Sequence, residues 1–255
     1  MPLSSTPVVG ATACASDPNR SLFSGMGVRP TGMLGARAFI ERFDPELCTQ
    51  GPVTEVSSWA LSWVSIDGPT EADPADGINI FQGGIAKCSG SDHCPWNLGN
   101  PFHFYYFAHS EGACSPPFNT KPVKLENVGP GSRLYEVSRR VAPPPTGAYW
   151  AFLIDGTSKH SRRGGDIMTC WGSIIQLEFK NEMMNVNDYN PGLVSNHQHF
   201  AEVQYQTSNG WHDTSWTLGR ECDAHSDRDF GLSNWRCFVS STDKNDFYQW
   251  DARAP

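Results

Sequence analysis

Short segments in which apolar and polar residues alternate recur along the chain from residue 36 onward, with turn residues between them. In residues 173–182 the charged side chains, Glu178 among them, share one parity with Gln176, and most apolar side chains share the other. Successive side chains of a strand point to opposite faces, so Glu178 is predicted to face away from the core. Strands are predicted at residues 36–43, 57–67, 78–87, 102–109, 122–127, 134–140, 149–155, 173–182, 199–206 and 235–240.

Many short strands separated by turns are typical of a sandwich or a barrel, so we expect an all-β protein. Residues 1–35 have no clean period, and we expect them to form an N-terminal arm or loops packed on the domain. Residues 36–255 are expected to form a single β-sandwich domain. The proline-rich residues 143–147 are flanked by similar strand patterns on both sides, so they are interpreted as a loop within it.

Composition supports this fold class and narrows the function. Glycine (24) and proline (19) are frequent, whereas only 18% of the residues are charged, which favours turns and short strands over long helices. The net charge of -8 and a single short basic cluster at residues 159–163 argue against nucleic-acid binding. No apolar run approaches the roughly 20 residues of a membrane-spanning helix, so we expect a soluble chain with no membrane partner.

The cysteines indicate the compartment. An even number of them is scattered along the chain without a zinc-type spacing, which favours disulfides over a metal site: Cys14, Cys48, Cys88, Cys94, Cys114, Cys170, Cys222 and Cys237. Proximity suggests the pairs Cys222 with Cys237, and Cys88 with Cys94 or Cys114. We therefore expect a secreted protein, although the first five residues lack the features of a signal peptide. Reduced, buried thiols are the alternative.

The predicted strand at residues 57–67 carries large aromatic side chains. Trp59, Trp63 and Asp67 have the same parity and so share one face. Flat rings beside a carboxylate are typical of a groove that binds a peptide or a sugar. The alternative is that both tryptophans belong to the core.

Three segments carry a resemblance to a known family. Residues 63–68 read Trp-Val-Ser-Ile-Asp-Gly, residues 78–85 read Ile-Asn-Ile-Phe-Gln-Gly-Gly-Ile, and residues 176–182 read Gln-Leu-Glu-Phe-Lys-Asn-Glu. This series resembles the glutamic peptidases (eqolisins), in which a Trp-Val-Gly-Ile-Asp-Gly strand precedes Leu-Gln-Thr-Gly and a later Ala-Glu-Trp-Ile-Val-Glu. Gln82 and Glu178 stand at the catalytic positions. The related neprosin group has glutamate where this chain has Gln82, and secreted bacterial proteins of the same superfamily look similar in general layout.

The resemblance implies a concanavalin-like jelly-roll β-sandwich of two antiparallel sheets with few short helices. It also implies a secreted acid endopeptidase without a cofactor or metal, in which Glu178 activates water and Gln82 stabilises the oxyanion. The two residues should then lie on adjacent strands, with their side chains converging on one open groove. The groove residues that bind a polypeptide substrate are expected to be Trp59, Trp63, Asp67, Lys180 and Glu182.

Departures from the family pattern leave alternatives open. Gly83 replaces threonine, Phe179 replaces tryptophan, and Lys180 stands where the family has an apolar residue. An ammonium group beside Glu178 would favour the charged carboxylate and could spoil an acid mechanism, unless Lys180 pairs with Glu182 instead. One alternative is a non-catalytic secreted binding or surface protein with a carbohydrate or protein ligand in an aromatic groove. A glycoside hydrolase on a similar sandwich is another.

Overall fold

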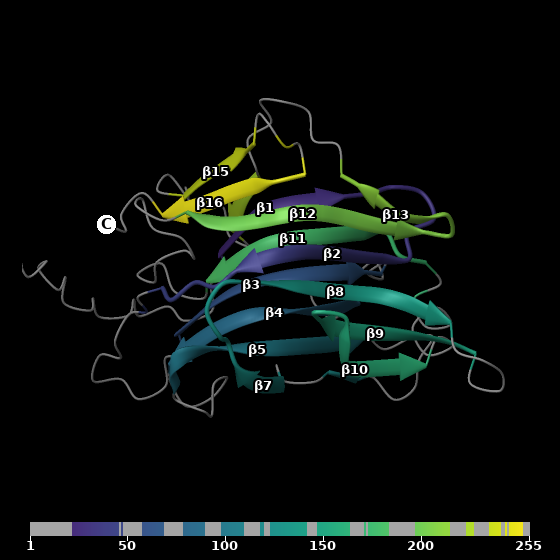
Figure 1. The fold of residues 1–255 in the computed structure, drawn as a ribbon, viewed down its shortest axis with the longest axis horizontal. Coiled ribbons are helices and arrows are strands. Elements are labelled where there is room, and N and C mark those ends of the chain that lie inside the picture. The colour runs from purple at the N-terminus through teal and green to yellow at the C-terminus, as the bar shows by residue number, and fades with distance from the viewer. Residues whose placement is uncertain are drawn as a thin grey trace, which may run out of the picture.

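The computed structural model describes the parts of the chain that build two β-sheets (Figure 1). The described residues are 22–45, 47, 58–68, 79–89, 98–109, 118–119, 123–141, 147–163, 171, 173–183, 197–214, 223–226, 235–240, 243 and 245–251. The pairings between strands are antiparallel throughout. The expected all-β sandwich of two antiparallel sheets is therefore confirmed.

The first sheet has the strand order β14, β1, β11, β3, β4, β5, β6, with β7 also paired to β5. Its strands are β14 (Asp223–Ser226), β1 (Leu22–Val28), β11 (Gln176–Met183), β3 (Ser58–Asp67), β4 (Ile80–Ser89), β5 (Leu98–His109), β6 (Phe118–Asn119) and β7 (Val123–Asn127).

The second sheet has the order β10, β9, β8, β2, β12, β16, β15, with β13 also paired to β12. Its strands are β10 (Thr157–Arg163), β9 (Ala148–Ile154), β8 (Ser132–Val141), β2 (Gly35–Glu41), β12 (Gln198–Thr207), β16 (Phe247–Asp251), β15 (Trp235–Val239) and β13 (Gly210–Asp213). Among the described residues, no helix is long and apolar enough to cross a membrane.

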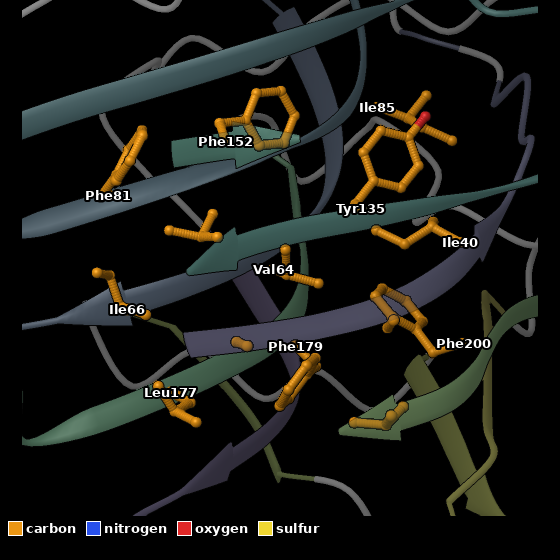
Figure 2. Close-up of a cluster of buried hydrophobic side chains, with 14 of the residues drawn as sticks. Ile40, Val64, Ile66, Phe81, Ile85, Tyr135, Phe152, Leu177, Phe179 and Phe200 are labelled. Atoms are coloured by element: carbon orange, nitrogen blue, oxygen red, sulfur yellow. The ribbon is translucent and has the colours of Figure 1, made fainter. Parts of the chain in front are cut away.

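The main core lies between the two sheets. Val64 of β3 and Phe179 of β11 project from the first sheet, and Tyr135 and Phe152 project from the second; all four are completely buried (Figure 2). Burial of each large apolar side chain stabilises the fold by about 1.5–3 kcal/mol. Because the apolar parity of each strand faces this core, the other parity of the first sheet forms a separate outer face.

Residues 22–28 differ from the expected arm or loops, because they form β1 within the first sheet. β1 pairs with β11 on one side and with β14 on the other. Its two glycines hide the alternation that identifies a strand in the sequence. Gly25 has a φ of 144°, and a Cβ atom there would lie 2.7 Å from the Cα of Lys180, so glycine lets β1 approach β11 at this point.

A buried polar pair spans the core between the sheets. The hydroxyl of Tyr135 on β8 lies 2.6 Å from Nδ1 of His103 on β5, and both side chains are almost fully buried. Burial is the main cause that lowers the pKa of His103 from its ordinary value of 6.5, and burial also raises the pKa of Tyr135. The fold thus favours the neutral imidazole.

This pair predicts that acid weakens the fold. As the pH falls below about 6.5, the unfolded chain binds a proton at His103 more readily than the native chain does. The free energy of unfolding therefore decreases, by at most about 1.4 kcal/mol per pH unit from this one histidine. Urea unfolding between pH 4 and 8 measures this effect. His103→Gln should show a shallower loss towards acid pH than the wild type, and equal slopes would contradict the assignment.

Candidate functional site

The register of three strands brings Glu178 and Gln82 onto the same outer face of the first sheet. Glu178 of β11 pairs with Ser65 of β3, and Ser65 pairs with Gln82 of β4. Residues directly opposite one another in antiparallel strands have side chains on the same face. We call Glu178, Ser65 and Gln82 the central row.

One feature of the expected arrangement is wrong: the strands of Gln82 and Glu178 are not adjacent, because β3 lies between them. Two strand spacings of about 4.8 Å separate their backbones by about 10 Å. Ser65 has a small side chain, so the longer side chains of Glu178 and Gln82 can approach each other above it. The outer face therefore carries the two candidate catalytic residues on either side of one intervening strand.

Glu178 is held by two donors from its own strand. Its Oε1 atom accepts hydrogen bonds from Nζ of Lys180, at 2.5 Å, and from Nε2 of Gln176. The Lys180 and Glu178 side chains are only 10% and 13% exposed. The expectation that Lys180 lies beside Glu178 is thus met by an ion pair that is largely shielded from solvent.

Asp67 lies on the same outer face, in the next row towards the end of β3. Ser65 donates a hydrogen bond from Oγ to its Oδ1 at 2.9 Å. Burial raises the pKa of the Asp67 carboxyl well above its ordinary value of 3.8, and the negative charge of Glu178 raises it further. The Ser65 hydrogen bond and the charge of Lys180 oppose this shift. Asp67 therefore retains its proton to higher pH than an ordinary aspartate.

The two tryptophans share the outer face as expected, but Trp63 is only 1% exposed. It belongs to a second apolar cluster of buried side chains, against which Trp59 and Tyr106 also pack: Leu61, Trp63, Ala86, Cys88, Phe102 and Phe104. Gln82 is 6% exposed and Glu182 is 8% exposed. The face is thus divided into an apolar part around Trp63 and a polar part around Glu178, and both are largely shielded from solvent rather than widely open.

Cys88 is the predicted disulfide residue whose side chain the structure describes. It is disulfide-bonded, and no free cysteine is found in the described part of the chain. Its bond partner, like the suggested pair of Cys222 with Cys237, lies outside what the structure describes. The remaining predicted disulfide residues also fall outside the described residues: Cys14, Cys48, Cys94, Cys114 and Cys170.

Three residues of this site were not singled out in the sequence. Ser65 stands between the two candidate catalytic residues, at a position where the family pattern has glycine. Gln176 donates to Glu178 and accepts a hydrogen bond from Nε of Arg29 at 2.8 Å. The parity of residues 176–182 could have placed Gln176 beside Glu178, but nothing local to residue 29 indicates its contact.

Within the described ranges, no group of three or more histidine, cysteine or acidic side chains is arranged to hold a metal ion. Comparison of the chain with protein-family models and with curated proteins matches none of them. The resemblance to glutamic peptidases therefore rests on the three motifs alone.

The environment of Asp67 predicts that Asp67→Asn stabilises the protein near neutral pH. Asparagine resembles the protonated carboxyl that the fold favours, and its Oδ1 can still accept the Ser65 hydrogen bond. The native-state preference for the proton means that the stabilising contribution of Asp67 is fully present below pH 3.8 and is lost as the pH rises through the raised pKa. The advantage of Asp67→Asn should thus shrink as the pH falls towards 3.8, which urea unfolding at pH 4 to 8 measures.

Asp155→Asn is the matched control. Asp155 is 43% exposed and forms an ion pair with Arg133 at 3.0 Å, so its amide variant should gain no stability at neutral pH. If Asp67→Asn is instead less stable than the wild type at pH 7, the account of this carboxyl is refuted.

Proposed function

We propose that the chain is an acid endopeptidase of the glutamic peptidase type, with Glu178 and Gln82 as its catalytic residues. The observation that carries the proposal is the central row, in which Gln82 and Glu178 flank Ser65 on one face. The sequence motifs suggested these two residues without regard to their position in space. Their convergence on one face, from strands about a hundred residues apart in sequence, supports a joint role.

The row contains the groups that peptide hydrolysis requires. The Glu178 carboxylate takes a proton from water as the water oxygen attacks the carbonyl carbon of the substrate. The NH₂ group of Gln82 donates a hydrogen bond to the oxyanion that forms. Glu178 then returns the proton to the amide nitrogen as the carbon–nitrogen bond breaks, which releases an amine and a carboxylic acid.

Asp67 supports operation in acid. Because its pKa is raised, Asp67 is a neutral, protonated carboxyl in acid. The Glu178 carboxylate is then not repelled by a second negative charge on the same face. This arrangement favours catalysis below neutral pH.

Two of the departures from the family pattern concern packing. Phe179 is completely buried in the core, and a Cβ atom at Gly83 would collide with the ring of Phe152, so both positions face the core rather than the central row. They therefore leave the chemistry of the outer face unchanged. Two other departures reach the proposed site: Lys180 through its ion pair with Glu178, and Ser65 as the middle residue of the central row.

That ion pair also favours a second candidate function, a non-catalytic binding protein. A carboxylate neutralised by a neighbouring ammonium is a common structural feature of a buried polar cluster. In this case the outer face of the first sheet would hold a polypeptide or carbohydrate ligand without cleaving it. No cleavage together with saturable binding of such a ligand would favour this candidate.

We further propose secretion, which the disulfide at Cys88 supports, because disulfides persist in oxidising compartments.

A cleavage assay tests the peptidase proposal. An unfolded protein substrate is incubated with the chain from pH 3 to 7, and new amino termini are measured. Glu178→Gln should lower kcat/KM by about 10²–10⁴-fold, and Gln82→Ala by about 10²–10³-fold. The two variants remove a proton acceptor and an oxyanion donor, respectively.

Matched controls separate catalysis from folding. Glu126→Gln changes an exposed carboxylate of β7 that pairs with Lys159, and Gln204→Ala removes an amide from the opposite sheet. Both should cleave within a few-fold of the wild type. The proposal is refuted if the wild type cleaves nothing across this pH range, or if the two catalytic variants cleave as well as the controls.

A further inference from the structure

The two carboxylate oxygens of Glu178 differ in their hydrogen bonds. Both donors described above, Lys180 and Gln176, bind the same atom, Oε1. In the described part of the chain, no hydrogen bond engages Oε2. The terminal torsion of a glutamate side chain has a broad, roughly two-fold profile, so hydrogen bonds rather than rotamer preference decide where its oxygens lie.

Gln176 is itself held in one orientation. Its Oε1 accepts from Nε of Arg29, and its Nε2 donates to Glu178. Arginine can only donate and a carboxylate can only accept, so a flipped amide would break both hydrogen bonds. Gln176 thus links Arg29, which follows β1, to the Glu178 carboxylate on β11 through two hydrogen bonds.

The glycines of β1 make room for both donors. A Cβ atom at Gly27 would lie 3.0 Å from Nε2 of Gln176, and one at Gly25 would lie 2.9 Å from Cγ of Lys180. Side chains at these two positions would displace the groups that hold Glu178. The two glycines of β1 therefore lie against the two donors on the neighbouring strand.

We propose that Gln176 and Lys180 are positioning residues that fix Oε1 of Glu178, so that Oε2 is the oxygen that takes the proton from water. Arg29 orients Gln176 for this task. The inference rests on the proposed peptidase function and adds to it a role for Lys180, the residue that departs most from the family pattern. Lys180 then assists the mechanism by orientation rather than blocking it.

Methionine variants test the positioning role of Gln176 and Lys180, because methionine resembles both side chains in length but donates no hydrogen bond. Misplacement of a reacting group by about 1 Å can cost about 100-fold in rate. Gln176→Met and Lys180→Met should each lower kcat by about 10-fold, and the double variant by about 100-fold, with KM nearly unchanged. Lys180→Arg, which keeps a donor, should retain more activity than Lys180→Met.

The second sheet supplies a matched control. Arg37 donates from Nε to Oε1 of Gln204 at 2.7 Å, and Gln204 donates from Nε2 to Asp213 at 2.6 Å, which is the same arginine, glutamine and carboxylate series. Gln204→Met should leave kcat unchanged. A double variant with wild-type kcat, or an equal loss in Gln204→Met, overturns the proposal.

A crystal structure of the double variant provides a readout that does not depend on activity. The Glu178 carboxylate should leave its wild-type position. An unchanged position overturns the proposal that Gln176 and Lys180 fix Oε1. If the wild type cleaves no substrate, the peptidase function fails, and this comparison still decides whether Gln176 and Lys180 position the carboxylate.

Discussion

Antiparallel pairing of β3 with β4 on one side and β11 on the other is the constraint on which the rest of the account depends. The pairing fixes Ser65 opposite both Gln82 and Glu178. A shift of either partner by one residue would turn its whole set of outer side chains into the core. The burial of Val64 and Phe179 between the sheets therefore holds the central row in place, because any slip would expose them and bury charges instead.

The two faces of the first sheet contribute differently to the molecule. The inner face forms the apolar core, where Gly83 and Phe179 differ from the family pattern but affect only packing. The outer face combines the apolar cluster around Trp63 with the ion pair of Glu178 and Lys180. The side chains of both are largely shielded from solvent. Charges that are shielded from solvent interact more strongly than charges in water. Lys180 and Asp67 therefore both influence the Glu178 carboxylate electrostatically.

Strand positions and faces could be predicted from the sequence wherever polar and apolar residues alternate. That pattern placed Glu178 and the two tryptophans correctly on the outer face. It missed β1, β6, β10, β13, β14 and β16; in β1 the cause is that Gly25 and Gly27 give no alternation. It also gave no strand order, because pairing between distant segments leaves no local signal. For this reason the insertion of β3 between the strands of Gln82 and Glu178, and the contact of Arg29 with Gln176, needed the structure.

If Gln82 and Glu178 act together on one substrate, a double-mutant cycle on kcat/KM for peptide cleavage will reveal it. Residues that act as a unit in one step show strongly non-additive effects. Gln82→Ala combined with Glu178→Gln should therefore be little slower than Glu178→Gln alone. Losses that simply multiply in the double variant would contradict it, because the two residues would then act independently.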